Sequence, residues 1–169
     1  MKKHILIGFF LLFISTLSAQ DFISVFMSER DDSGGVTISI SGKMLRMSAA
    51  SDSNADPNFK KLVKDIDKIK MVSDINLDSD DKKRLKKLLL NYEELMVIAE
   101  SEEKIAMYTK EKKGKVTEFV LYIESDDTLV LLSILGNIDI KQLSKLANSV
   151  NINGMEHLEK LDNKSNKDK

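Results

Sequence analysis

The feature that most constrains the fold is a pair of neighbouring strand-like runs that are apolar on both faces. The first spans residues 115–123 and the second residues 128–135, with only the short polar turn ESDD between them. A strand with one solvated face alternates apolar and polar residues, whereas a strand that is apolar on both faces needs cover on both sides. We therefore expect these runs to form an antiparallel hairpin in the middle of a sheet.

Further strands are expected before this hairpin in the sequence. Residues 95–100 and 104–109 precede it as strand-like runs separated by charged turns, and residues 36–41 and 69–75 alternate apolar with polar side chains. This pattern predicts a two-layer α+β domain, with a mostly antiparallel sheet of about five or six strands and helices packed mainly on one face.

The expected helices are amphipathic and begin at recognisable caps. Asp56 precedes Pro57, the only proline, as an N-cap precedes the first helical residue. Asp139 with Gln142 three residues later has the spacing of a capping box. The helical stretches are residues 21–30, 44–49, 57–66, 78–92 and 139–150, with a last short helix after Gly154.

The N-terminus has the layout of an export signal. Lys2 and Lys3 precede an apolar run from Ile5 to Ile14, and small or polar residues follow up to Ala19. The rival interpretation is an uncleaved membrane anchor, but the run has ten residues, where a spanning helix needs ~20. We expect cleavage after Ala19 and export to the periplasm or beyond the cell.

This export signal sets the domain boundaries. Residues 1–19 are the expected cleavable signal, residues 20–162 a single domain, and residues 163–169 a disordered tail without apolar side chains. The chain has no cysteine, so it carries neither disulfides nor the lipid of a bacterial lipoprotein. No later segment approaches the length of a transmembrane helix.

Charge argues against nucleic acid as a partner. Loss of the two lysines with the signal lowers the formal net charge from -1 to -3. A mildly acidic, exported protein offers little attraction to a phosphate backbone.

Side chains suited to catalysis are present, but no known catalytic or metal motif is formed. Asp78, Asp80 and Asp81 fail the calcium-loop frame and are better explained as a helix cap. His157 is the only histidine after the signal, which argues against a histidine-based triad or zinc site. Glu118 lies mid-strand among apolar residues and is expected to mark a partly solvated face. We expect no enzyme activity and no cofactor, although a pair of carboxylates could still act as acid and base.

Two surfaces are candidates for contact with a partner. The first is an apolar helical face near the start of the mature chain, formed by Phe22, Ile23 and Phe26. The second is a basic run for an anionic surface, formed by Lys82, Lys83, Arg84, Lys86 and Lys87. The basic run also fits the solvated face of an amphipathic helix.

Two segments carry a resemblance to a known family. GKVTEFVL at residues 114–121 and LVLLSILGNIDIKQLSKL at residues 129–146 resemble the strand and strand-to-helix units of the domain of unknown function 4252 family. The resemblance implies a small exported protein of Bacteroidetes-type bacteria with no established activity. Family genes near extracytoplasmic-function sigma factors further suggest envelope stress or signalling.

Another similarity lies within the chain. VTISISGK at residues 36–43 and VLLSILGN at residues 130–137 share Val, Ser, Ile and Gly at matching positions. A duplication and a common local solution remain alternative explanations.

From these observations we expect a non-enzymatic interaction or regulatory module of the bacterial cell envelope, with an unknown protein partner. The alternatives are a periplasmic carrier or sensor of a small apolar ligand and, less favoured, a carboxylate-based hydrolase.

Overall fold

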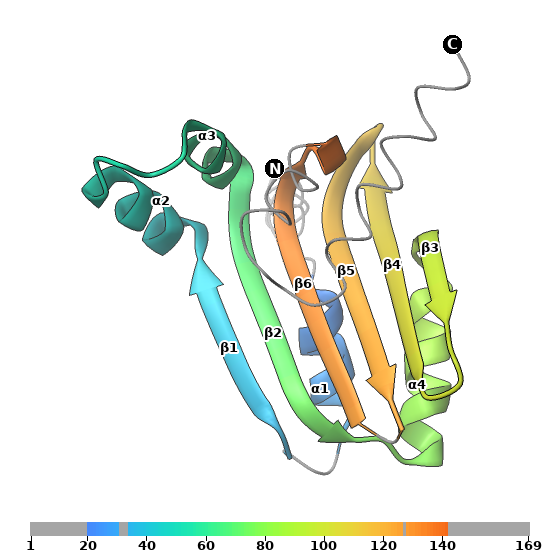
Figure 1. Cartoon of the computed structure of the whole chain (residues 1–169). Coiled ribbons are helices and arrows are strands. Elements are labelled where there is room, and N and C mark those ends of the chain that lie inside the picture. Colours follow the sequence, from blue (N-terminus) through green and yellow to red (C-terminus); the bar gives the residue numbers. More distant parts are fainter. Residues whose placement is uncertain (1–19, 31–33, 127, 142–169) are drawn as a thin grey trace, which may run out of the picture.

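The protein is an α+β structure built on one six-stranded sheet (Figure 1). The structure is a computed structural model that describes residues 20–30, 34–126 and 128–141. Its elements are α1 (Phe22–Ser28), β1 (Val36–Ser41), α2 (Gly42–Ser51), α3 (Pro57–Asp65), β2 (Ile66–Asn76), α4 (Ser79–Leu89), β3 (Glu93–Ala99), β4 (Glu103–Lys112), β5 (Lys115–Ser125) and β6 (Thr128–Ile138).

All neighbouring strands pair antiparallel, in the order β1-β2-β6-β5-β4-β3. The two runs that are apolar on both faces are β5 and β6, and both lie inside the sheet as predicted. β6 lies between β2 and β5, so the last strand of the sheet joins the N-terminal strands to the β3–β4–β5 meander. The predicted fold class is confirmed.

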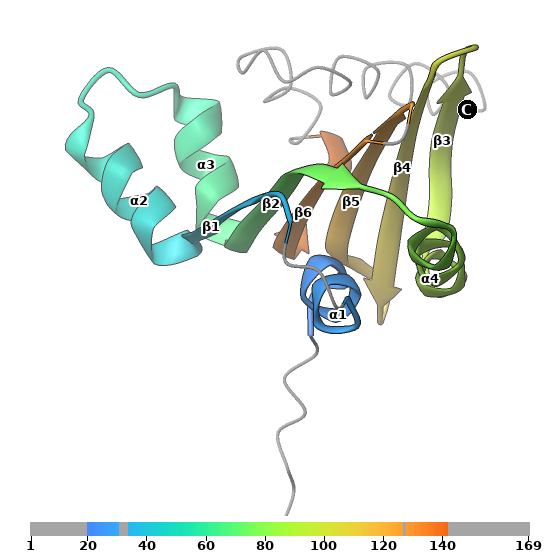
Figure 2. The same ribbon diagram turned by 90° about the horizontal axis from the view of Figure 1, so that it is seen from below.

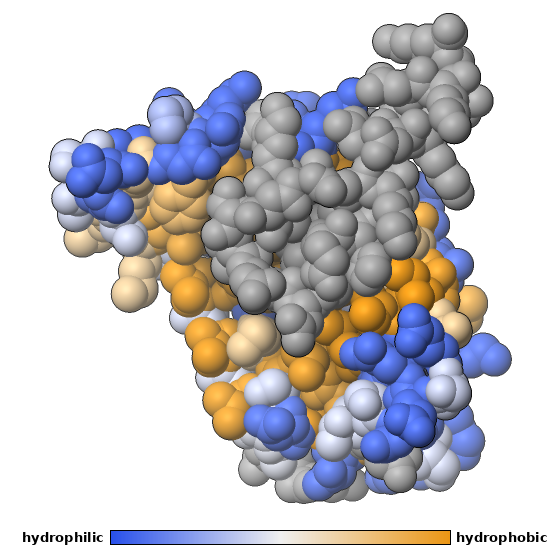
Figure 3. All heavy atoms as spheres, in the orientation of Figure 1, coloured by the Kyte–Doolittle hydropathy of each residue, from blue (hydrophilic) through white to orange (hydrophobic). Residues whose placement is uncertain are grey.

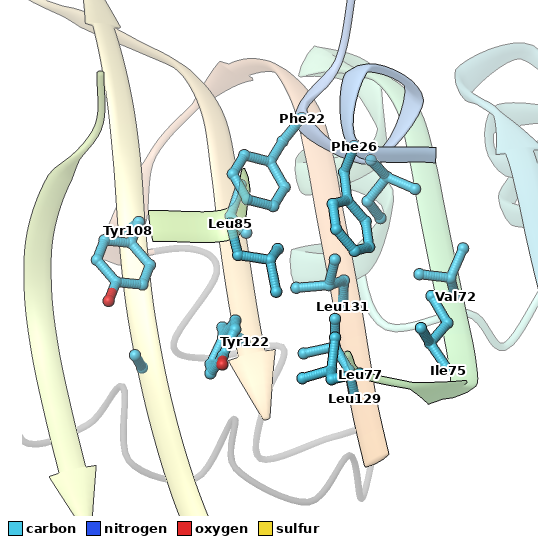
Figure 4. Packing of buried hydrophobic residues seen from close by; sticks show 13 residues of the cluster. Phe22, Phe26, Val72, Ile75, Leu77, Leu85, Tyr108, Tyr122, Leu129 and Leu131 are labelled. Atoms are coloured by element: carbon cyan, nitrogen blue, oxygen red, sulfur yellow. The ribbon is translucent and has the colours of Figure 1, made fainter. Parts of the chain in front are cut away.

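Helices α1 and α4 cover one face of the sheet, which we call the helical face (Figure 2). Phe22 and Phe26 of α1 pack against β2 and β6, and Leu85 of α4 packs beside them (Figure 4). The buried residues of this core are Phe22, Ile23, Phe26, Val72, Ile75, Leu77, Leu85, Ala106, Tyr108, Val120, Tyr122, Leu129 and Leu131. The helical face therefore holds the larger of the two cores.

A second core lies on the opposite face of the same strands. Its buried residues are Leu62, Ile66, Met107, Phe119, Leu121, Leu132, Ile134 and Ile138. Of these, Leu62 comes from α3, which forms a pair with α2 beside the β1 edge (Figures 1 and 2). Apolar surface continues across this face toward β1 (Figure 3).

Local sequence signals define the ends of several elements. The Asp56 carboxylate accepts a hydrogen bond from Asn58 N at 2.8 Å, which confirms the cap in front of Pro57. The β4–β5 hairpin turns at Lys113 and Gly114, both with positive φ, as a type I′ turn requires.

The glycines of the two similar segments both pack against the start of β2. A Cβ on Gly42 would lie 2.0 Å from the Ile66 carbonyl oxygen, and one on Gly136 would lie 2.1 Å from that of Asp65. Because β1 and β6 flank β2 on opposite sides, the same steric demand falls on Gly42, directly after β1, and on Gly136 within β6. The similarity has a structural cause in this close approach, whether or not it also has an evolutionary one.

Two local predictions were wrong. The second apolar run was expected to end at residue 135, but β6 continues through Gly136 and Asn137 to Ile138. Residues 69–75 were expected to alternate regularly, but a register shift between Val72 and Ile75 puts both in the core on the helical face. Asp74 lies in this irregular stretch with a φ of 58°.

Several predictions concern residues outside the described ranges. These are the export signal at residues 1–19, the capping partner Gln142, the helices expected after residue 142, and the tail at residues 163–169.

Candidate functional site

A groove opens on the helical face between α4 and strands β3, β4 and β5. Its volume is about 580 Å³, which falls within the range of small-molecule and peptide sites, roughly 300–1,000 Å³. The lining residues are Lys82, Leu85, Lys86, Leu89, Leu90, Tyr92, Glu94, Lys104, Tyr108, Tyr122 and Glu124. We refer to this site as the α4 groove.

All three tyrosines of the chain line the α4 groove, and each lies beside a different glutamate. Tyr92 donates to Glu118 with an oxygen–oxygen distance of 2.7 Å. The Tyr122 hydroxyl donates to Glu124. Glu94 lies directly opposite Tyr108 on β3, and its charge contributes to the raised pKa of Tyr108.

These pairs arise from the register of the strands. Tyr108 on β4 and Tyr122 on β5 project from the same face of the sheet, and Figure 4 shows their hydroxyls on that side. Glu124 is two residues after Tyr122, so the pleat puts both on one face. The result is an aromatic wall in which the rings of Tyr92 and Tyr122 are held by hydrogen bonds.

The same pairs keep the tyrosines protonated. Burial raises the pKa of Tyr92 above its ordinary value of 10.0, and its hydrogen bond to Glu118 raises it further. Burial and the bond to Glu124 raise the pKa of Tyr122 in the same way. For Tyr108, burial again comes first, followed by the nearby charge of Glu94. The groove therefore presents neutral phenols at physiological pH.

Lysines surround the aromatic wall. Lys82 Nζ lies 3.2 Å from a Glu124 carboxylate oxygen, and Lys104 Nζ lies 5.6 Å from the centroid of the Tyr122 ring. Lys86 lines the groove with an exposed side chain, one turn of helix after Lys82. The groove thus combines an apolar interior with a basic rim.

Glu118 connects one end of the groove to α1. Its carboxylate accepts from the Phe22 backbone N–H at 2.8 Å, the Ser133 hydroxyl at 2.6 Å and the Tyr92 hydroxyl at 2.7 Å. Glu118 is 4% exposed, so the expectation of a partly solvated face was wrong. The sequence showed a charge among apolar residues but not the three donors, which come from α1, β6 and the segment after α4.

A second buried carboxylate also holds α1 on the sheet. Asp21, the N-cap of α1, accepts from Ser24 N at 2.7 Å. Its carboxylate oxygens lie 3.6 Å from Lys68 Nζ and 3.9 Å from Lys70 Nζ, both on β2. Lys70 also donates to the Ser24 hydroxyl at 2.7 Å.

The apolar surface predicted as a partner face is part of the core. Phe22, Ile23 and Phe26 are 1%, 0% and 0% exposed. This corrects the expectation, because a partner could reach these side chains only if α1 left the sheet. The physical reason is that α1 is short and directs its whole apolar side at β2 and β6.

The predicted basic run lies along α4, where some of its side chains pair with acidic residues of the same helix and others line the groove. Lys83 pairs with Asp80 at 2.9 Å and Arg84 with Asp81 at 3.6 Å, both three residues away on the same helix. Lys82 and Lys86 line the groove, whereas Lys87 is exposed and lies outside it. The run is therefore a solvated helix face with one edge in the site.

The acidic residues at the start of α4 act as the predicted helix cap. The Asp78 carboxylate accepts from Asp80 N at 2.8 Å and from Asp81 N at 2.7 Å, and the bond from Asp81 is the main cause that lowers the pKa of Asp78. Asp81 is buried and paired with Arg30. Across the described ranges, no group of three or more His, Cys, Asp or Glu side chains is placed to hold a metal ion.

The α4 groove itself was not foreseen from the sequence. One signal was available, since Tyr108 and Tyr122 lie on consecutive predicted strands, and the register that pairs Tyr108 with Val120 puts both tyrosines on one face of the sheet.

None of the helices in the described part of the chain is long and apolar enough to span a bilayer.

One comparison with known proteins gave a match. The model of the family described as "Domain of unknown function (DUF4252)" matches residues 26–146, which include β1 to β6 and the whole α4 groove. No curated protein and no solved structure matches the chain.

Proposed function

The chain belongs to the family of the domain of unknown function DUF4252, and we propose that it is a non-enzymatic interaction module whose α4 groove receives a segment of a protein partner. The observation that carries this proposal is the aromatic wall of three tyrosines, of which Tyr92 and Tyr122 are hydrogen-bonded to glutamates and Tyr108 lies opposite a third glutamate. Rings held in this way lose little entropy on binding, and tyrosine is enriched where proteins contact one another.

The chemistry of the groove favours binding over catalysis. Glu118 and Glu124 are already engaged by tyrosine hydroxyls, so neither of them lies ready to take a proton from a substrate. The raised tyrosine pKa values likewise oppose a phenolate nucleophile.

The rim and the interior of the α4 groove indicate which kind of partner segment would bind there. Leu89 and Leu90 offer apolar contact, and Leu90 is 80% exposed. Lys86 and Lys104 add positive charge at the edge. A partner segment with an apolar anchor flanked by acidic residues would match both features.

We place this module in the bacterial cell envelope. The support is the signal-like sequence up to Ala19, together with the position of Asp21 as the cap of α1 two residues later. The mass of the protein recovered from envelope fractions checks the proposal, since it should lack the first 19 residues. A role in envelope stress rests on the family resemblance alone.

The groove is tested with charge variants matched on one helix. Lys86→Glu changes the rim, whereas Lys87→Glu makes the same change on an exposed residue outside the groove. Leu90→Ser removes the exposed apolar contact without disturbing a core residue.

Tagged versions of these proteins are compared in pull-downs from crosslinked envelope fractions, read by mass spectrometry. We expect recovery of the partner to fall by at least about tenfold with Lys86→Glu and Leu90→Ser, and to be unchanged with Lys87→Glu. Equal loss with both lysine variants would indicate general charge attraction and would contradict the groove as the site.

A second candidate is a carrier or sensor of a small amphipathic ligand in the same groove. The volume of about 580 Å³ favours it. Native mass spectrometry decides: a copurifying ligand that is absent from Leu90→Ser supports the carrier, and an empty groove counts against it.

A further inference from the structure

The outer edge of β1 has features that favour pairing with another strand. β1 is the terminal strand of the sheet, and among the described elements it pairs with β2 alone. Its six residues, VTISIS, include four β-branched side chains, no proline and no charge. Edge strands usually carry lysine, proline or a bulge that blocks further pairing. β1 has none of these, and its pairing with β2 shows no register shift.

The opposite edge of the sheet is better protected. β3 begins with Glu93 and Glu94, and its pairing with β4 contains a register shift between Glu94 and Met96. Charges and bulges of this kind disfavour edge-to-edge association. The β1 edge is therefore better suited to pairing with another strand than the β3 edge is.

Apolar side chains of β1 are exposed to solvent, although they lie on a face that is buried in the central strands. Val36, Ile38 and Ile40 lie on the face of the second core, opposite Ser73, Met71 and Ile69 of β2. Val36 is 53% exposed and Ile38 is 45% exposed. Thr37 and Ser39, which alternate with them, point to the helical face beside Val72 and Lys70.

We propose that β1 pairs antiparallel with β1 of a second copy of this chain, about a two-fold axis at Ile38. Directly opposite residues of an antiparallel pair share a face of the sheet. In this register Ile38 faces Ile38 of the second copy, Val36 faces Ile40, and Thr37 faces Ser39. All apolar residues of the strand then meet apolar residues, and hydroxyls meet hydroxyls.

The absence of charge and the match of the strand to itself favour a second copy over a different partner. An isologous interface requires each residue to suit its counterpart across the axis, and this register meets that requirement at every position from Val36 to Ile40. A register centred on Ser39 would instead put Val36 opposite Gly42, leaving its side chain without an apolar neighbour. The product is a continuous sheet with the helices of both copies on one side.

Helix α2 extends the apolar surface next to this edge. It follows β1 directly and projects beyond the sheet (Figures 1 and 2). Met44 and Met47, one helical turn apart, are 65% and 61% exposed. Their flexible, apolar side chains suit contact with a neighbouring molecule.

The proposal is tested on the full chain, expressed with its own N-terminus, by sedimentation velocity over a range of concentrations. Ile38→Lys puts two like charges opposite each other at the two-fold axis. Val97→Lys makes the same kind of change at an exposed apolar residue of the other edge strand, since Val97 is 37% exposed. We expect Ile38→Lys to weaken self-association by at least about tenfold and Val97→Lys to leave it unchanged.

A second measurement fixes the register and uses the absence of native cysteine. Under mild oxidation Ile38→Cys should form a disulfide-linked dimer, because residues facing each other across the axis bring their Cβ atoms close. Val97→Cys should not. A chain that is monomeric at every concentration would overturn the proposal, as would a dimer equally weakened by both lysine variants. Circular dichroism melts confirm that each variant is folded.

Discussion

Replacement of Glu118 gives the sharpest test of how the buried polar network holds α1. Glu118→Ala removes the acceptor for three donors, of which Phe22 N and the Ser133 hydroxyl belong to residues that are 1% and 0% exposed. A buried donor left without a partner costs about 1–3 kcal/mol, so these two donors together cost about 2–6 kcal/mol. The Tyr92 hydroxyl lies at the groove and can turn to water, so it adds less.

The isosteric variant separates loss of the acceptor from loss of the charge. In Glu118→Gln, the amide oxygen can accept from Phe22 N and Ser133, and the amide group can donate to the Tyr92 hydroxyl, which then accepts. The geometry is preserved and only the charge assistance is lost, so we expect a cost of about 1–2 kcal/mol. For a domain whose total stability is of order 5–15 kcal/mol, the two variants should differ clearly.

The assay is urea unfolding followed by circular dichroism, with hydrogen exchange of the α1 amides as a local probe. We expect the unfolding midpoint of Glu118→Ala to fall well below that of Glu118→Gln, with faster exchange across residues 22–28. Equal costs for the two variants, or a cost under about 1 kcal/mol for Glu118→Ala, would refute the reasoning.

Two further predictions follow from the close packing at the start of β2 and from the groove. Gly42→Ala and Gly136→Ala should each destabilise the fold by about 3 kcal/mol or more in urea unfolding, because the new Cβ meets backbone atoms, and Gly136 in addition has a positive φ. Gly114→Ala, whose Cβ would meet nothing within 4 Å, should cost only about 1–2 kcal/mol from its positive φ, and equal costs at all three glycines would contradict this explanation. In an alkaline titration at 295 nm the three tyrosines should stay neutral beyond their ordinary pKa of 10.0. Since only the folded state raises these pKa values, the free energy of unfolding should decline as the pH rises above about 10, and phenolate should appear together with unfolding. Titration of the tyrosines near pH 10 in protein that is still folded would contradict the burial of the hydroxyls.

Much of the architecture followed from periodicity in the sequence. The apolar runs at residues 115–123 and 128–135 identified the central strands because a buried strand has no polar face to show. Caps such as Asp56 and Asp78 were readable because the side chain bonds within three residues of itself.

The features that were missed depend on contacts between distant segments. Glu118 is buried by partners that lie 96 and 26 residues earlier and 15 residues later in the chain, a distance at which local patterns carry no information. The strand was expected to end before Gly136, yet this glycine lies within β6 and allows a close approach to Asp65. The α4 groove likewise forms only when α4 and three strands meet.

The position of β6 in the sheet governs the order in which the molecule can be assembled. Its pairing with β2 joins Gly136 to Ile66 and Thr128 to Asn76, so it closes long loops of chain. Until residues 128–138 are present, β1–β2 and β3–β4–β5 are two separate ribbons of two and three strands, and the smaller ribbon is too small to be stable alone. Completion of the sheet must therefore wait for residues 128–138, and folding should be slow for the length of the chain. A chain whose sheet is completed only by its last strand stays incompletely folded until its synthesis has passed residue 138.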